Sequence, residues 1–240
     1  MTFDFSKIVE PVKLILEKYK DLPNIELEGR LGVYDHDENV FDTNIGDEYY
    51  SDIKNLLDSC VEWKEKQTSS NTDYFSDCLR LTTDNNSAQQ YCIRKKKLAM
   101  FTFLNETGPL DFRISIATEE PVRVDSFSKK KKNSLKQREK DRKSYILNDF
   151  SYDLTKVVTK EDNTPIEYCE YEVEFQGEFE DKDSGQIIFS LIMKLLDASA
   201  ALDGFVKTKD NSLPLDKINY TIFKAKEVNE LTGKLNDLKI

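Results

Sequence analysis

The chain has 240 residues, of which 38% are hydrophobic and 33% are charged, so it can bury a core while carrying more charge than an average globular domain. Its 45 acidic and 35 basic side chains give a net charge of −10, which argues against a protein that coats duplex nucleic acid by bulk electrostatics. Any phosphate ligand would have to be met by a local set of bases, and the length favours one domain over residues 1–240.

Three elements are predicted in the first part of the chain. In FSKIVEPVKLILEKYKDL, apolar residues recur at helical spacing from Phe5 to Tyr19, and we expect Pro11 to interrupt or kink this helix. The next segment, NIELEGRLGVY, alternates strictly and predicts a strand. A second helix is predicted in DEYYSDIKNLLDSCVEW.

Seven further strand-like segments follow: TDYFS, CLRLTTD, QYCIRKKKLAMFTF, LDFRISIATEEPV, LKQREKDRKSYIL, FSYDLTKVV and EYCEYEVEFQGEF. Many strands at short spacing predict an antiparallel sheet or barrel. The final predicted element, SGQIIFSLIMKLLDASAALDG, is a buried helix with Asp183 or Ser184 as its N-cap and Gly204 as its C-cap. The basic run from Lys129 to Lys132 is expected to form an exposed loop.

Cysteine and histidine offer little chemistry in this chain. Cys60, Cys78, Cys92 and Cys169 are widely spaced, so neither a zinc site nor a disulfide framework is expected, and a reducing, intracellular setting fits. The only histidine, His36, lies among turn-forming residues and is expected in a loop. No signal peptide is visible, and no run approaches the ~18 apolar residues of a membrane span, so we expect no membrane partner.

Several predicted strands carry like charges along one face. Alternation in the first strand places Glu26, Glu28 and Arg30 opposite its apolar residues, and a later strand does the same with Glu170, Glu172 and Glu174. A basic strand places Arg138, Lys140 and Arg142 on one face. Other strands add further polar residues in phase: Arg80 and Thr82, Lys95 and Lys97, and Arg113, Ser115 and Glu119.

A single charged strand face is typical of a solvated surface, but several such strands favour another arrangement. A closed barrel with helices packed on its outside would bury the apolar faces against the helices and leave a polar interior. Carboxylates are the ligands that Mg²⁺ and Mn²⁺ prefer, and bases would neutralise phosphates. The sequence thus predicts an α+β protein whose barrel interior holds a divalent cation against a polyphosphate.

Five motifs in this order resemble a known family: IELEGRLG, DFRISIATEEPV, REKDRKSY, YDLTKV and YEVEF. They are similar to the strands of the metal-dependent RNA 5'-triphosphatases of fungal and viral mRNA capping. These enzymes belong to the triphosphate tunnel metalloenzymes, so the resemblance, which runs from Ile25 to Phe175, implies an eight-stranded antiparallel barrel around the active site.

The resemblance also implies roles for individual residues. The metal ligands would be Glu26, Glu28 and Glu174, with Glu172 beside them, and the cofactor would be Mg²⁺ or Mn²⁺. Glu119 would orient the attacking water. The phosphate-binding residues would be Arg80, Lys95, Arg113, Lys140 and Arg142, with Arg30 and Arg138 also contributing. Supporting acids would be Asp73, Asp153 and Glu170. Arg94, Lys96 and Lys97 offer alternative registers to Lys95.

The implied reaction is hydrolysis of the γ-phosphate of 5'-triphosphate RNA to leave a 5'-diphosphate end, with manganese-dependent hydrolysis of free NTPs as a second activity. Two alternatives stay open: a tripolyphosphatase, and a non-catalytic polyphosphate-binding subunit of a capping enzyme. The chain has no P-loop G-x-x-x-x-G-K-[ST] and no H-C-x-x-x-x-x-R motif, which disfavours two other phosphatase chemistries.

Partners and location follow from the same resemblance. The K-x-D-G motif of a guanylyltransferase is missing, so a guanylyltransferase or methyltransferase would act in cis within a longer protein or in trans. We expect a monomer rather than a dimer. The expected location is intracellular, either a viral factory or virion, or the nucleus or cytoplasm of a host cell.

Overall fold

The computed structural model describes residues 6–105, 108–127, 136–161, 164–200 and 218–222. The elements in chain order are α1 (Ser6–Tyr19), β1 (Ile25–Asp35), β2 (Val40–Asp42), α2 (Gly46–Ser59), β3 (Glu65–Ser76), β4 (Leu79–Asp84), β5 (Gln90–Phe103), β6 (Asp111–Val122), the 3-10 turn η1 (Val124–Ser126), β7 (Gln137–Leu147), β8 (Phe150–Glu161), β9 (Thr164–Phe175), α3 (Ser184–Ala200) and β10 (Ile218–Ile222). None of the helices in these ranges is long and apolar enough to cross a membrane.

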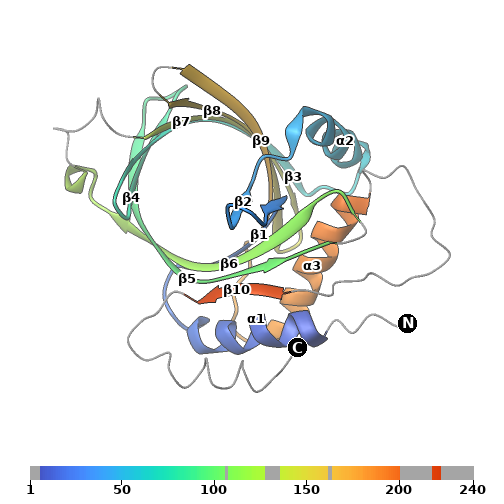
Figure 1. Cartoon of the computed structure of the whole chain (residues 1–240). Helices are drawn as coiled ribbons and strands as arrows, with labels where there is room; N and C mark the ends of the chain where they lie inside the picture. Colours follow the sequence, from blue (N-terminus) through green and yellow to red (C-terminus); the bar gives the residue numbers. More distant parts are fainter. Residues whose placement is uncertain (1–5, 106–107, 128–135, 162–163, 201–217, 223–240) are drawn as a thin grey trace.

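Eight antiparallel strands close into a barrel (Figure 1). Each strand pairs with two neighbours in the cyclic order β1, β6, β5, β4, β3, β7, β8, β9 and back to β1. Two short strands extend this sheet, because β2 pairs with the end of β1 and β10 pairs with the second half of β5. The prediction of an eight-stranded antiparallel barrel with helices on its outside is therefore confirmed.

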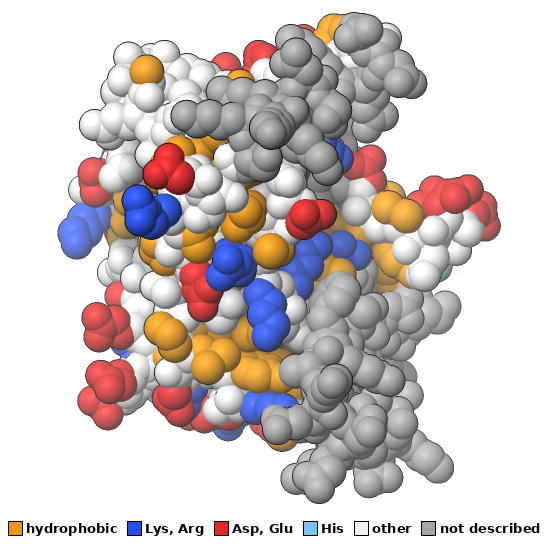
Figure 2. All heavy atoms as spheres, turned by 90° about the vertical axis from the view of Figure 1, so that its left-hand side faces the viewer, with side chains coloured by type: hydrophobic (Ala, Val, Ile, Leu, Met, Phe, Trp, Pro, Cys, Tyr) orange, Lys and Arg blue, Asp and Glu red, His pale blue; other side chains and the backbone are white. Residues whose placement is uncertain are grey.

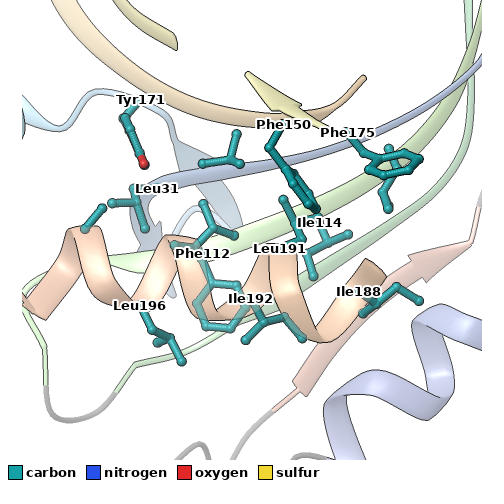
Figure 3. Close-up of a cluster of buried hydrophobic side chains, with 14 of the residues drawn as sticks. Leu31, Phe112, Ile114, Phe150, Tyr171, Phe175, Ile188, Leu191, Ile192 and Leu196 are labelled. Atoms are coloured by element: carbon teal, nitrogen blue, oxygen red, sulfur yellow. The ribbon is translucent and has the colours of Figure 1, made fainter. Parts of the chain in front are cut away.

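The apolar faces of the strands point outward and pack against helices. Figure 3 shows side chains of α3 lying among apolar side chains of β1, β6, β8 and β9. Leu191 and Ile192 of α3 and Phe112 and Ile114 of β6 are fully buried in this layer. Each such side chain contributes about 1.5–3 kcal/mol when it leaves water. The main hydrophobic core of the described residues thus lies between the barrel wall and the helices.

A glycine on β1 lets α3 approach the barrel closely. A Cβ atom at Gly29 would lie 2.5 Å from Cδ1 of Leu195, closer than carbon atoms pack. On the other side of α3 lies α1, whose apolar residues Ile8, Val12 and Ile15 are completely buried. Helical spacing in both segments therefore corresponds to one continuous apolar layer outside the barrel.

Several element boundaries differ from the sequence predictions. Pro11 lies inside one continuous helix, so the predicted interruption is wrong, and the alternative of a kink stays a prediction. The second helix ends at Ser59, and Trp63 lies beyond it, where its Nε1 donates a hydrogen bond to the Leu57 carbonyl at 2.6 Å. β3 begins at Glu65, seven residues before the predicted TDYFS segment, and β2 and β10 were not predicted at all.

Two turn predictions are confirmed. His36 lies in the turn between β1 and β2, and Asp183 caps α3, because its Oδ1 accepts the N–H groups of Gly185 and Gln186. Three predicted features lie outside the described residues: Phe5 at the start of the first helix, the loop from Lys129 to Lys132, and the Gly204 cap.

The outer surface mixes side chains of all kinds on the face seen in Figure 2. Lys and Arg side chains gather across the middle of this face, hydrophobic side chains lie below them, and acidic side chains are scattered over it.

Candidate active site

A cavity of about 290 Å³ lies inside the barrel. Its lining contains every predicted site residue except Arg113, Asp73 and Asp153. The lining residues are Glu26, Glu28, Arg30, Ser69, Asn71, Arg80, Tyr91, Lys95, Glu119, Arg138, Lys140, Arg142, Ser144, Glu170, Glu172 and Glu174. A larger hollow of about 570 Å³ lies on the outer wall beside α2, but Arg142 is the one predicted site residue in its lining. The charges converge in the smaller, internal cavity.

Two neighbouring strands form the acidic side of the cavity. β1 and β9 are paired so that Glu28 lies opposite Glu174 and Arg30 lies opposite Glu172. Glu26, Glu28 and Glu172 are each less than 10% exposed. The alternation read from the sequence therefore brings the predicted carboxylates together on one wall.

Burial and mutual repulsion act strongly on these carboxylates. Burial, reinforced by the charge of Glu28, raises the pKa of Glu174 to about 7, and the same two causes raise the pKa of Glu26 well above its ordinary value. Burial would also raise the pKa of Glu28, but Arg30 and Lys95 outweigh it and hold that pKa well below the usual range. On the acidic wall, repulsion and burial therefore outweigh the positive charge near Glu26 and Glu174.

One lysine of β5 contacts carboxylates on two neighbouring strands, β1 and β6. Nζ of Lys95 lies 2.8 Å from Glu26, 3.1 Å from Glu119 and 3.7 Å from Glu28. Arg80 of β4 also contacts Glu119, at 3.1 Å. The lysine that faces the cavity at this point is Lys95, whereas Arg94 pairs with Glu120 on the exposed surface. These contacts place Glu119 between two cations.

The basic strand β7 is separated from β9 by β8, and acidic residues hold its side chains in place. Nζ of Lys140 lies 2.5 Å from the carboxylate of Asp73, which is 1% exposed. Arg142 is 2.7 Å from Asp153 and 2.9 Å from Glu172. Asp73 and Asp153 do not line the cavity themselves. Each forms an ion pair with a basic residue that does, as expected for supporting acids.

Two further arginines each have a buried N–H group that lacks a hydrogen-bond acceptor among the described residues. Arg138 contacts Glu170 at 2.8 Å, yet its Nε atom is buried without a hydrogen-bond partner among the described residues. Nε of Arg80 is also buried without a hydrogen-bond partner among these residues. A buried N–H donor without an acceptor costs about 1–3 kcal/mol, so both positions would gain from an anion in the cavity.

Arg113 is not part of the cavity lining. Its guanidinium lies 4.3 Å from the ring centroid of Phe41, and its Nε donates to Oγ1 of Thr102 at 3.1 Å. Phe41 belongs to β2, the short strand that sequence reasoning missed. Its ring also packs close to Gly32, where an added Cβ atom would lie 2.7 Å from Cε1 of Phe41. The predicted role of Arg113 in phosphate binding stays a prediction.

The donor set suits a hard divalent cation, although the described residues are not arranged around one. No three carboxylate, histidine or cysteine side chains converge as ligands in this part of the chain, and Lys95 contacts both Glu26 and Glu28. Oε2 of Glu26 is nevertheless buried without a partner, and Glu174 makes no hydrogen bond or ion pair within the described ranges. Crowded carboxylate oxygens of this kind match the ligands that Mg²⁺ and Mn²⁺ prefer.

Four uncharged residues of the lining were not predicted: Ser69, Asn71, Tyr91 and Ser144. Ser144 continues the two-residue spacing of Arg138, Lys140 and Arg142, and Tyr91 lies in phase with Lys95, so both could have been found from alternation. Ser69 and Asn71 lie in a segment that is polar on both faces, where alternation gives no signal.

Comparisons with known proteins show the family of this chain. The family model described as the beta chain of the mRNA capping enzyme matches residues 30–187. A curated relative, the mRNA-capping enzyme subunit beta of Yarrowia lipolytica, is 40% identical over 80 residues, which are 33% of this chain. The match spans 19% of that relative's length.

Solved structures share the fold at low sequence identity. The S. pombe Pct1 RNA triphosphatase is 17% identical with a TM-score of 0.66, and the match covers 83% of this chain and 94% of that one. A second structure of Pct1, in complex with the Spt5 CTD, has a TM-score of 0.67 at 16% identity, with 83% and 95% covered. The Mimivirus capping enzyme triphosphatase is 15% identical with a TM-score of 0.56, and 84% and 99% are covered.

Proposed function

Since this chain belongs to the family of mRNA capping enzyme beta chains, we propose that it removes the γ-phosphate from the 5'-triphosphate end of RNA. The products would be a 5'-diphosphate end and inorganic phosphate. The observation that carries this proposal is the pairing, inside one cavity, of a carboxylate wall on β1 and β9 with basic side chains on β4, β5 and β7. Such a cavity attracts a polyanion and a cation at the same time.

The bases of the cavity would hold the triphosphate and balance its charge. Arg138, Lys140 and Arg142 follow one another at two-residue spacing along β7, so they can contact successive phosphate groups. Arg80 and Lys95 approach from β4 and β5. Preorganised cations of this kind stabilise the charge that develops at the leaving group during phosphoryl transfer.

The metal proposal concerns Mg²⁺ or Mn²⁺ and the carboxylates of β1 and β9. Glu26, Glu28 and Glu174 would hold the ion, and Glu172, which is already paired with Arg30 and Arg142, would serve as an accessory residue. When bound, such an ion polarises phosphate oxygens and neutralises their charge. The pKa of Glu174, raised by burial and by Glu28, supports this assignment because a cation would relieve the repulsion.

Glu119 is proposed to orient the attacking water. Its carboxylate lies within reach of both Arg80 and Lys95, and it faces the same cavity as the carboxylates of β1. A carboxylate oxygen in this position can accept a hydrogen bond from water. Attack would then run in line with the leaving β-γ bridging oxygen.

We also propose the partners, the cellular location and the oligomeric state of the protein. The remaining capping steps would be supplied by a guanylyltransferase and a methyltransferase, in cis or in trans, wherever the RNA is capped: the nucleus or cytoplasm of a cell, or a viral factory. Residues 1–240 would form one domain that acts as a monomer.

The decisive experiment measures γ-phosphate release from triphosphate-ended RNA with Mg²⁺ or Mn²⁺. We expect activity in the unaltered protein and a loss of about 100-fold or more in both Glu26→Ala and Glu174→Ala. The matched control is Glu167→Ala, an exposed glutamate on the outer face of β9. Full activity in both cavity variants, or metal-independent release, would sink the proposal, and a parallel assay with tripolyphosphate gives the substrate preference.

A further inference from the structure

One aromatic residue lines a cavity that is otherwise built from charged and small polar side chains. Tyr91 of β5 is the only aromatic among the described residues of the lining. It is 50% exposed, which is unusual for a large ring that faces the inside of a barrel. Within the described part of the chain its hydroxyl makes no hydrogen bond and its ring contacts no other ring or cation. Half of this side chain therefore faces solvent, and its ring and hydroxyl are open to a ligand.

The position of Tyr91 relative to the phosphate-binding residues is defined by the strand register. Tyr91 precedes Lys95 by four residues on the same face of β5, which corresponds to about 13 Å at a strand rise of about 3.3 Å per residue. It pairs with Thr82 on β4, two residues beyond Arg80 along that strand. The ring thus lies at the end of the cavity where β5 begins, away from the bases that would hold a γ-phosphate.

The strand directions place this ring at one mouth of the barrel. β5 begins at the same end at which β7 finishes, because the strands are antiparallel in the order β5, β4, β3, β7. Ser144, the last residue of the β7 series in the lining, lies towards that end. An extended ligand with its terminal phosphate among the bases would leave the cavity past uncharged side chains and the Tyr91 ring.

We propose that Tyr91 is a stacking platform for the base of the first nucleotide of the substrate, and that it distinguishes nucleotide triphosphates from tripolyphosphate. This inference rests on the proposed function and adds a specificity residue to it. A triphosphate followed by a ribose spans the separation between the bases and the ring. Aromatic rings stack on any base, so the platform would accept RNA regardless of its first nucleotide.

The test compares Tyr91→Ala, Tyr91→Phe and a control, Phe189→Ala, which removes a comparably exposed ring from the outer helix α3. Stacking on one aromatic ring corresponds to a change of about 5- to 100-fold in affinity. We expect Tyr91→Ala to lower kcat/KM for triphosphate-ended RNA by this factor and to leave kcat/KM for tripolyphosphate unchanged. Tyr91→Phe and Phe189→Ala should behave like the unaltered protein with both substrates.

A binding measurement makes the inference independent of turnover. The fluorescence of 2-aminopurine riboside triphosphate falls when its base stacks, so we expect quenching on binding to the unaltered protein and to Tyr91→Phe, and none with Tyr91→Ala. Equal quenching by Tyr91→Ala, or an equal loss of activity on tripolyphosphate, would overturn the platform. If the unaltered protein quenches but releases no phosphate, the stacking platform stands and the proposed hydrolysis fails.

Discussion

Glu28 and Glu174 lie directly opposite each other where β1 pairs with β9, and both side chains face the cavity. Like charges opposite each other on neighbouring strands destabilise a sheet. Arg30 and Lys95 relieve Glu28 of this repulsion, since they lie 3.2 Å and 3.7 Å from its carboxylate, but Glu174 has no such partner among the described residues. The pair is therefore a point where added positive charge stabilises the protein.

The first prediction is that Mg²⁺ or Mn²⁺ raises the thermal stability of the protein. A ligand that binds only the folded state at about 100 times its Kd stabilises by about 2.7 kcal/mol. Glu26→Gln and Glu174→Gln should each remove most of the metal-dependent rise in Tm, while Glu167→Gln should retain it. Calorimetry with and without metal provides the measurement, and an unchanged rise in both cavity variants would contradict the assigned ligands.

The second prediction concerns pH in the absence of metal. Burial and Glu28 raise the pKa of Glu174 from 4.5 to about 7, so the folded state binds this proton more tightly than the unfolded chain does. The contribution of Glu174 to the free energy of unfolding is therefore fully present below about pH 4.5 and is lost as the pH rises through about 7. The loss is on the order of 3 kcal/mol. Urea unfolding in EDTA should show that the free energy of unfolding falls less between pH 5 and pH 8 in Glu174→Gln than in the unaltered protein. An equal fall in the two proteins would count against the raised pKa of Glu174.

The third prediction distinguishes two roles of Lys140, which are the binding of phosphate and the ion pair with Asp73. Replacing Lys140 by methionine leaves the carboxylate of Asp73 buried without its ion pair, which costs about 3–5 kcal/mol of stability. The double variant Lys140→Met with Asp73→Asn should recover most of that loss, because no unpaired charge remains. Both variants should be defective in phosphate release. Denaturant unfolding of the two proteins checks the stability difference, and equal instability would argue that Asp73 does not depend on Lys140.

The fourth prediction tests the outer layer without touching the cavity. A methyl group at Gly29 would collide with Cδ1 of Leu195, so Gly29→Ala should lower the free energy of unfolding by about 1–3 kcal/mol. Adding Leu195→Ala should relieve the collision, and the double variant should lose less than the sum of the two single losses. Thermal unfolding supplies the data. Additive losses would show that α3 does not press on β1 at this residue.

Period-two alternation predicted much of the cavity because the barrel keeps its charges inside. In β1 and β9 an apolar face meets helices while the other face meets the cavity, so the charged residues of both strands were visible in the sequence. In β7 the other face is itself mostly charged, and the signal was the repeat of basic residues at every second position. Alternation failed where neither face is apolar and no charge of one sign repeats. The first half of β3, EKQTSSN, is polar on both sides and gave no strand signal.

The position of Arg113 could not be predicted for a different reason. Its phase on β6 was read correctly, but the ring of Phe41 covers it from β2, a strand of only three residues. Such a short segment shows no periodicity, and it pairs with β1 only where β9 has left that strand. Contacts of this kind depend on how strands end, which local sequence patterns do not encode.

The hydrophobic layer between α3 and the barrel wall assigns folding and chemistry to different residues. Apolar side chains on the outward faces of the strands supply most of the free energy of folding. The side chains that would face a phosphate point into the barrel, often from the next position along the same strand. Selection can therefore alter one set while the other persists. Copies of this chain that lose both partners of a cavity ion pair would remain folded and able to occupy a binding partner, whereas copies that lose apolar side chains of the outer layer would unfold and be degraded.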